Sequence, residues 1–597
     1  MRALAILWMF GCSGSIGGAP SIIDAPANLD ALDARDPDPR PIDASTPPGR
    51  GATVPWIEYE AEDGVTTGTI VGPSREVGTP AGEASGRRAV ILDAPGQRVT
   101  WTTTRDANAI VVRYSIPDGP NGGGTRATLG LYVDDHRRAS LALDSRAAWI
   151  YGDEGTQVDQ PSAGHPRRIY TEAHLLLDAT IPAGARVALV KDRGDAAPWY
   201  AIDFIDLELV PPPLGKPPGF LSITEPGHPW APAIPDDGKP DDDAIAQCLN
   251  AAMSGQYAGV YLPAGTFEQA SKLQVEGITV QGAGMWYSTL YSASLAPDPG
   301  WGQTGFIITG DHTTFRDFAI RGNTDGLRTQ GGKAWVNSAF SDTLIERMWV
   351  ENVQCGYWVG GTEPSTHLVI RDSRFRDTGA DAVNLCNGTR DSVVENDHAR
   401  NTGDDAFAIW SATDLYPHPD TNNVIRRCTV QITWRAAAFA IYGGDGNRIE
   451  DSVASDTLTY PGITLSSEFQ PYPMQSAIVD GVTLIRTGGT YWGGQDFGAI
   501  WLRADQDPTR GITVKNVDVI EPSHQGIHIQ SNGGVLDDVT FDHVTIDRPG
   551  SYGVEIKPGA AGRARFSSVT IHDPGAAALE NGAPTTFTVD DGGGNTW

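Results

Sequence analysis

Residues 368–410, LVIRDSRFRDTGADAVNLCNGTRDSVVENDHARNTGDDAFAIW, contain one pattern twice. Each copy begins with a β-branched run, at Val369-Ile370 and at Val393-Val394, and continues to a Thr-Gly pair, at Thr378 and at Thr402. The second pair follows the first at an interval of 402 − 378 = 24. A repeat in the twenties is the length of one coil of a parallel β-helix, in which each coil packs its apolar face against the next. The stretch therefore predicts a β-solenoid.

The same pattern recurs on both sides of this stretch. Five apolar positions begin successive coils, at steps of 25, 24, 31 and 24 along the chain: Ile345, Ile370, Val394, Ile425 and Ile449. The longer step holds an insertion, Ser411 to Pro419, which we expect at the rim of a groove. Residues 241–253 have an amphipathic helical period and are expected to cap the first coil. Residues 219–597 are thus predicted to form a right-handed parallel β-helix, a pectin-lyase-like solenoid in an all-β protein.

Three aspartates in these coils hold most of the functional information. Asp381 aligns with Asp405 of the next coil, and Asp404 aligns with Ala380. Equivalent positions of neighbouring coils stack at the strand spacing, roughly 4.8 Å. Carboxylates this close repel each other, and the repulsion raises the pKa of at least one of them. Such a site can offer a protonated acid beside an ionised base at one pH.

This arrangement fits hydrolysis of a glycosidic bond, which needs a protonated carboxyl at the leaving oxygen and a second group across the sugar. Asp404 lies one residue off the stacked pair, and we assign it as general acid. Asp381 and Asp405 would activate a water molecule together, which implies inversion at the anomeric carbon. No cofactor is needed for this chemistry.

Other interpretations of the aspartates stay open. Gly-Asp-Asp is a common turn sequence, because Asp tolerates unusual backbone angles. Clustered carboxylates also bind calcium. The chain could then be a non-catalytic solenoid that binds a surface polysaccharide. It could also be a calcium-assisted lyase with Arg435 as proton acceptor.

Aromatic side chains near the aspartates could stack on glucosyl rings. Each of them could equally belong to the core of the solenoid. Together with Arg435, the candidates for substrate binding are Trp410, Trp434, Tyr442 and Trp492.

The N-terminal third of the chain has a different organisation. Residues 1–12 resemble an export signal, and cleavage before Cys12 with lipid attachment would make a bacterial lipoprotein; otherwise Cys12 is incidental. Residues 13–54 are rich in Gly, Ser, Pro and Asp and predict a disordered acidic linker. Short alternating strands over residues 55–210 predict a separable β-sandwich. A Pro-rich linker, residues 211–218, follows it.

The overall charge limits the partners. Lys and Arg number 44 and Asp and Glu number 74, so the net charge is 44 − 74 = −30. An acidic protein is a poor partner for nucleic acid or an anionic membrane surface, and it suits a neutral substrate. After the N-terminal segment, no apolar run approaches the ~18 residues of a membrane span.

Several motifs resemble one family. The segments 282–290 (GAGMWYSTL), 400–411 (RNTGDDAFAIWS) and 442–444 (YGG) are similar to the mycodextranases and α-1,3-glucanases of glycoside hydrolase family 87. The resemblance implies an inverting hydrolase with three catalytic aspartates at this spacing. It also implies an α-1,3-glucan or nigeran substrate, such as a fungal cell-wall glucan, cleaved in endo fashion. One departure is Ala382, where the family tends to have Gly. Polygalacturonases share the fold and a similar aspartate pattern, but their Gly-His and Arg-x-Lys motifs do not occur at the expected coil.

The start of the sandwich resembles a second group of proteins, the carbohydrate-binding modules of families 6 and 35. The resemblance lies in the run Glu58-Tyr59-Glu60-Ala61-Glu62. It implies a structural calcium ion held by Glu60, Glu62 and Asp206, all oxygen ligands of the kind that Ca²⁺ prefers. The alternative is that these are solvated charges on strands.

Overall fold

The computed structural model describes residues 47–151, 166–294, 303–324, 326, 328, 331–337, 341–359, 364–412, 418–469, 472–490 and 494–597. The predicted signal segment with Cys12 and the predicted substrate-binding residue Trp492 lie outside these ranges. In the described part of the chain, no helix is both long and apolar enough to cross a membrane.

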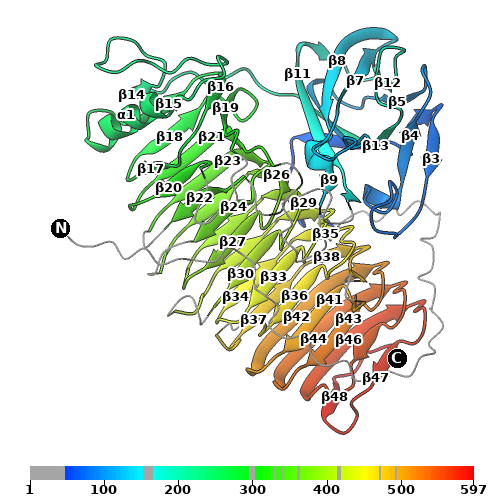
Figure 1. Ribbon diagram of the computed structural model, residues 1–597. Coiled ribbons are helices and arrows are strands. Elements are labelled where there is room, and N and C mark those ends of the chain that lie inside the picture. The colour runs from blue at the N-terminus through cyan, green and yellow to red at the C-terminus, as the bar shows by residue number, and fades with distance from the viewer. Residues whose placement is uncertain are drawn as a thin grey trace.

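The C-terminal two thirds of the chain form the predicted parallel β-helix. Figure 1 shows it as a long stack of coils that runs from α1 to β48. A 21-stranded sheet and a 12-stranded sheet wrap the coils, and their strands pair in parallel. The smaller sheet contains β17 (Leu273–Val275), β20 (Phe306–Ile308), β22 (Lys333–Asn337), β24 (Cys355–Val359), β27 (Val383–Cys386), β30 (Phe407–Trp410), β33 (Phe439–Tyr442), β36 (Ile463–Ser466), β41 (Ile500–Ala504), β43 (Ile527–Ser531), β45 (Val554–Ile556) and β47 (Leu579–Asn581).

The larger sheet carries the repeat that the sequence reveals. It runs from β14 (Phe220–Ser222) to β48 (Phe587–Asp591) and includes β23 (Leu344–Glu351), β25 (Val369–Arg371), β26 (Arg374–Thr378), β28 (Val393–Glu395), β29 (His398–Thr402), β31 (Val424–Arg426), β32 (Thr429–Gln431) and β34 (Asn447–Glu450). The five predicted coil anchors are in direct register, from Ile345 through Ile370, Val394 and Ile425 to Ile449. Each is almost fully buried, so they form one apolar column inside the solenoid.

The first coil is closed by the predicted helix, α1 (Asp242–Met253). Its buried face includes Ile245 and Leu249. This face packs against β14, β15 (Gly259–Leu262) and β17. The helix thereby covers the end of the sheet and its apolar interior.

The N-terminal unit is a sandwich of two antiparallel sheets. One sheet holds β1 (Trp56–Glu60), β3 (Thr69–Val71), β4 (Ala89–Leu92), β6 (Ala107–Ser115), β11 (Thr171–Ile181) and β13 (Tyr200–Glu208). The other holds β2 (Val65–Thr66), β5 (Arg98–Thr102), β7 (Arg126–Val133), β8 (His136–Asp144) and β12 (Arg186–Val190). A short pair, β9 (Trp149–Ile150) with β10 (Arg167–Arg168), extends from it. The sandwich has its own core, centred on residues such as Ile110, Leu131 and Ile202.

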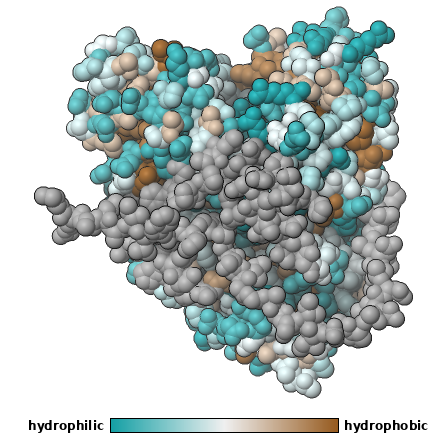
Figure 2. Space-filling view, viewed as in Figure 1, coloured by the Kyte–Doolittle hydropathy of each residue, from teal (hydrophilic) through white to brown (hydrophobic). Residues whose placement is uncertain are grey.

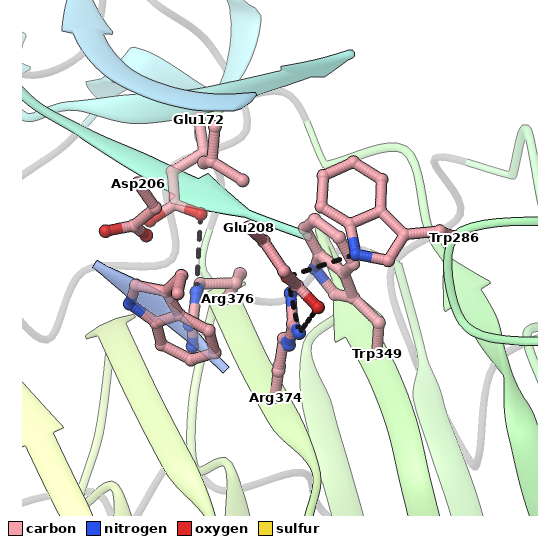
Figure 3. A pocket seen from close by; sticks show the side chains of 9 residues that line it. Glu172, Asp206, Glu208, Trp286, Trp349, Arg374 and Arg376 are labelled. Carbon is pink, nitrogen blue, oxygen red and sulfur yellow. Dashed lines mark hydrogen bonds and ion pairs between the residues drawn. The ribbon is translucent and has the colours of Figure 1, made fainter. Parts of the chain in front are cut away.

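A column of solenoid arginines joins the two units, which lie side by side in Figure 1. Arg374 and Arg376 of β26 and Arg400 of β29 lie beneath the sandwich and are buried. Their partners are sandwich carboxylates: Glu208 for Arg374, Glu172 for Arg376, and Glu58, Glu172 and Asp206 for Arg400. Figure 3 shows part of this network, with Trp286 and Trp349 beside it.

These ion pairs are buried, and separating the units would leave three guanidinium groups without their carboxylates. The contacts favour one joined unit over the separable module that the sequence predicts. Figure 2 shows hydrophilic residues mixed with smaller hydrophobic patches over the sandwich and the α1 end of the solenoid.

Both predicted linkers are tied to the solenoid where the structure describes them. The sequence predicts a disordered linker as far as residue 54, but Arg50 forms an ion pair with Asp518 at 2.5 Å, and the Gly51 amide donates to the Asp451 carbonyl at 2.7 Å. In the Pro-rich linker, the Leu214 amide donates to the Ala283 carbonyl at 2.8 Å. Composition predicts chain flexibility but not the polar partners that another coil supplies.

Candidate active site

Two of the three aspartates stack as the coil period predicts. Asp381 lies two residues before Val383, the first residue of β27, and Asp405 lies two residues before Phe407, the first residue of β30. Val383 and Phe407 are register partners. Both aspartates therefore occupy the same turn of neighbouring coils, between the larger sheet and the smaller one.

Asp405 is held by two donors. The Ala437 amide donates to Oδ1 at 2.8 Å, and the Tyr442 hydroxyl donates to Oδ2 at 2.8 Å. The side chain is buried, and burial together with the charge of Asp381 raises its pKa to about 7. This carboxyl can therefore exchange a proton near neutral pH.

Asp381 is also buried, but its surroundings favour the charged form more. The Asn384 amide group donates to its Oδ1 at 3.1 Å, and the Arg328 guanidinium is near. Burial still dominates and raises the pKa of Asp381 to about 6, against the opposing effect of Arg328. The charge of Asp381 thus acts on Asp405, its neighbour in the stacked turns.

Asp404 has different partners. Its Oδ2 forms ion pairs with Arg328 and, at 3.0 Å, with Arg435. Its side chain is 21% exposed, so solvent or a ligand can reach it. Two stacked turns thus present a pair of buried carboxylates and one accessible carboxylate that is paired with two arginines.

Two glycines let the surrounding groups approach this turn. A Cβ on Gly379 would lie 2.4 Å from the Arg328 carbonyl oxygen. A Cβ on Gly403 would lie 2.0 Å from Cζ2 of Trp434. The repeated Thr-Gly pair is therefore required for packing, because the backbone of one segment and an indole ring occupy the space of a side chain.

The predicted substrate-binding aromatics have different roles in the structure. Trp434 is buried over Gly403, and Tyr442 is buried as the donor to Asp405. Trp410 is partly exposed and lies next to Tyr442 in the sheet register. Of the three described candidates, Trp410 is therefore the most accessible to a sugar ring.

Two of the predicted calcium ligands have different partners in the structure. Asp206 pairs with Arg400 at 3.0 Å. Glu60 instead accepts a hydrogen bond from the Ser85 hydroxyl at 2.7 Å. Across the described ranges, no group of three or more His, Cys, Asp or Glu side chains is arranged to hold a metal ion. Asp206 thus lies opposite an arginine of the solenoid, a partner that the strand pattern alone cannot indicate, and the calcium site stays a prediction.

Comparisons with known proteins agree with this geometry. Residues 53–210 match the family model "Alpha-1,3-glucanase catalytic domain D1", and residues 241–597 match "Alpha-1,3-glucanase catalytic domain D2". A solved GH87 α-1,3-glucanase catalytic domain in complex with tetrasaccharides is 32% identical, with a TM-score of 0.82 over 92% of this chain and 100% of that one. The chain belongs to glycoside hydrolase family 87.

Other solved members of family 87 are similar in length. The catalytic unit of the thermostable α-1,3-glucanase from Streptomyces thermodiastaticus is 30% identical, with a TM-score of 0.77 over 92% of this chain and 97% of that one. The Agl-KA catalytic domain is 26% identical, with a TM-score of 0.81 over 91% of this chain and 98% of that one. No curated protein sequence matches the chain.

The family model also bears on the sandwich. Its domain D1 covers the sandwich and its domain D2 covers the solenoid, so family 87 counts both as catalytic domains. The resemblance of the sandwich to a carbohydrate-binding module stays a prediction. That both family models are described as catalytic domains agrees with the buried ion pairs between the sandwich and the solenoid.

Two polar residues of the site were missed by the sequence reasoning. Asn384 lies three residues after Asp381 on the same coil, and a polar residue in an otherwise apolar strand was a signal that could have found it. Arg328 lies much earlier in the chain than Asp404, in a segment whose sequence does not show the coil repeat. No sequence signal relates Arg328 to the aspartates.

Proposed function

We propose that this member of family 87 is an inverting, endo-acting hydrolase of α-1,3-glucosidic linkages. The observation that supports it best is the stack of two turns in which Asp381 and Asp405 are buried beside the accessible Asp404. Three solved structures of the family each carry one Asp→Ala substitution. Two of the substituted positions are consecutive, and the third lies one coil repeat before the second of these two. This is the spacing of Asp404, Asp405 and Asp381.

In this proposal Asp381 and Asp405 position and deprotonate one water molecule. Their pKa values are raised to about 6 and about 7, so the two carboxyls lose their protons and become able to act as bases as the pH rises toward neutrality. Tyr442 and the Ala437 amide fix the orientation of Asp405. The water would attack the anomeric carbon from the side opposite the leaving oxygen.

Asp404 is the proposed general acid. Its ion pairs with Arg328 and Arg435 favour the ionised form in the free enzyme. Protonation would therefore accompany substrate binding, because a sugar ring over the exposed face of Asp404 removes water and disfavours the charge. The proton would then pass to the leaving oxygen as the glucosidic bond breaks.

The lyase alternative has less support. An arginine that removes a proton must itself be neutral, whereas Arg435 is paired with Asp404 at 3.0 Å, an arrangement that stabilises the guanidinium cation. A lyase would release products with an ultraviolet-absorbing double bond, and a hydrolase would not. Product spectra on polygalacturonate and on α-1,3-glucan distinguish the two reactions.

The stereochemistry of the product tests the inverting mechanism. An α-linked glucan cleaved by direct attack of water gives the β-anomer first, before mutarotation. Proton NMR of the fresh product is expected to show the β-anomeric signal ahead of the α signal. An initial α-anomer would mean that one aspartate acts as a nucleophile, and the shared-water proposal would fail.

The substrate is proposed to be α-1,3-glucan or nigeran, the alternating α-1,3/α-1,4 glucan. Related structures of the family hold nigerose and tetrasaccharides. Product profiles on the two polymers side by side decide between them. Products of several lengths at early times would support endo action, and a single short product would contradict it.

We also propose that the protein acts outside a bacterial cell. Met1–Arg2, the apolar stretch Ala3–Phe10 and Cys12 form the pattern of a lipoprotein signal. Cys12→Ser is expected to move the protein from the membrane fraction to the soluble exported fraction. An unchanged distribution would contradict lipid attachment at Cys12.

A further inference from the structure

Arg328 connects both aspartate-bearing coils. Its guanidinium pairs with Asp404, and its Nε donates to the Gly403 carbonyl at 3.2 Å. Its own carbonyl oxygen lies over Gly379, where a Cβ would be only 2.4 Å away. The Arg328 side chain is 15% exposed, so it lies largely inside the protein beside the catalytic turn.

The sandwich holds the segment that carries Arg328. The Tyr151 amide donates to the Gly326 carbonyl at 3.1 Å, and Arg146 Nη1 donates to Oδ1 of Asn323 at 2.5 Å. A Cβ on Gly326 would lie 1.9 Å from the Trp149 carbonyl oxygen, so the two backbones touch. Gly326 and Asn323, two and five residues before Arg328, thus both contact the sandwich.

A small cavity lies between these contacts and the catalytic turn. It has a volume of about 20 Å³, enough for a water molecule. Its sandwich wall is Ala147, Ile150 and Ile169, and its opposite wall includes Arg328 and Trp434. The sandwich therefore reaches the immediate surroundings of the catalytic aspartates.

We propose that Arg328 is a positioning residue for Asp404. We also propose that the contacts of the sandwich with Gly326 and Asn323 hold Arg328 beside the catalytic turn. The proposal rests on the role given to Asp404 above. Among the described residues, the charged groups paired with Asp404 are Arg328 and Arg435, and the carboxylates of the same stacked turns are Asp381 and Asp405. Arg328 fixes the direction of the Asp404 carboxyl and sets the pH range in which it can carry a proton.

Removing the charge of Arg328 has a defined consequence. A cation within about 4–6 Å lowers the pKa of a carboxyl by about one unit or more. Arg328→Gln is therefore expected to raise the pKa of Asp404, the proposed acid, and of Asp381, part of the proposed base. Both limbs of the pH–kcat profile should move to higher pH by about one unit, and kcat should fall by about 100-fold because an aligned donor is lost.

The experiment compares Arg328→Gln with Arg328→Lys on a soluble α-1,3-linked tetrasaccharide across the pH range. The lysine variant keeps the charge but not the two-nitrogen geometry, so kcat should fall while both limbs stay in place. Arg426→Gln, which loses an ion pair of the solenoid surface with Glu395, is the matched control and should resemble the wild type. Circular dichroism and Tm check that each variant is folded.

The outcomes separate this inference from the proposed function. If Arg328→Gln moves neither limb, Arg328 does not act on the catalytic carboxyls and the inference is overturned. If only the acidic limb moves, Arg328 affects the pKa of the proposed base, which includes Asp381. Asp404 is then not the proton donor, and the proposed function needs revision. If both limbs move, both stand.

The contribution of the sandwich is tested by Gly326→Ala. The added methyl group cannot fit beside the Trp149 carbonyl, so the segment must shift while every charged group remains. The variant should reproduce the limb shift of Arg328→Gln, and the double variant should shift no further. Arg146→Ala, which only removes the bond to Asn323, should give a smaller shift in the same direction. If both variants have the pH–kcat profile of the wild type, the sandwich does not hold Arg328 in place and this part of the inference is overturned.

Discussion

At the scale of single residues, the three aspartates differ through their partners rather than through their own chemistry. Asp405 has a hydroxyl and an amide as donors, whereas Asp404 has two guanidinium groups. Burial is the main cause of the raised pKa of Asp405, whereas Asp404 is partly exposed and paired with two arginines. Identical side chains one residue apart can therefore serve as base and acid.

The proposed acid is tested by a leaving group that needs no proton. Asp404→Asn should lower hydrolysis of α-1,3-glucan by roughly 10³-fold, because general acid catalysis is lost. Hydrolysis of an α-glucosyl fluoride should fall less than about 10-fold, because fluoride leaves without protonation. Asp405→Asn is the comparison and should lose both activities. Equal losses of both substrates in Asp404→Asn would argue against the acid role.

Tyr442 gives a second prediction at this scale. Tyr442→Phe removes a hydrogen bond that stabilises the ionised Asp405, so the pKa of Asp405 should rise further. Because the base must be ionised, the acidic limb of the pH–kcat profile should move to higher pH, with kcat about 10-fold lower at its acidic side. Tyr552→Phe, in the C-terminal coils, is the control. An unmoved acidic limb would show that Tyr442 does not act through Asp405.

The residue scale also shows what sequence can predict about this site. The stacking of Asp381 and Asp405 follows from the coil period alone. The role of Tyr442 does not, because a tyrosine at a strand end can stack on a ligand or donate to a carboxylate, and only the neighbouring coil decides which. Arg328 is unpredictable for a different reason, since the contact depends on a sandwich that holds its segment.

At the scale of elements, strands β26 and β29 have two faces with different tasks. Their inward residues, such as Phe375 and Ala399, are in the apolar core. Their outward residues are the arginines that bind the sandwich. Alternation along a strand predicts two faces, and the sequence shows that alternation. The sequence does not show that the sandwich covers the outward face of these strands.

Asp377, at this buried boundary, gives a prediction on stability. Its carboxyl accepts hydrogen bonds from Thr171 at 2.7 Å and from Asn401 at 2.5 Å, and burial with the charge of Glu172 raises its pKa to about 7. A pKa above the unfolded value of 3.8 means that the folded state is favoured at low pH and loses stability as the pH rises through about 7. The loss amounts to roughly 2–3 kcal/mol between about pH 5 and about pH 8.

Asp377→Asn cannot titrate and can keep both hydrogen bonds. The decrease in Tm between these two pH values should therefore be smaller in the variant than in the wild type. Asp372→Asn, on an exposed turn of the same coil, is the control and should show the wild-type decrease. A variant with the same pH dependence as the wild type would mean that Asp377 is not a main source of it.

At the scale of the whole molecule, buried contacts join the sandwich and the solenoid into one body. The ion pairs of Arg374, Arg376 and Arg400 are buried between them, and the segment before Arg328 is fastened to the sandwich. The fold of each unit follows from its own repeat or strand pattern. Their mutual position does not, because it depends on pairs of charges that lie far apart in the sequence and meet only in the folded molecule.

Removal of the sandwich tests this unity. A chain of residues 211–597 should lose activity on short soluble oligosaccharides as severely as on insoluble glucan, because the partners of Arg400 and the contacts of Gly326 are gone. A module that only raised the local concentration of enzyme would affect insoluble glucan alone. Rates on both substrates, with Tm as a check of folding, distinguish the two cases. Near-normal activity on the short substrate would contradict a joint catalytic body.

The ordered arm at residues 50–53 also bears on how the molecule is assembled during synthesis. Arg50 leaves the ribosome early, but its partner Asp518 is 468 residues further along the chain. At roughly 5–20 residues per second, the arm waits on the order of 20 to 90 s before that coil exists. The sandwich can close around its own core meanwhile, with its carboxylates exposed. The arm can therefore be fastened only after most of the coils have been synthesised.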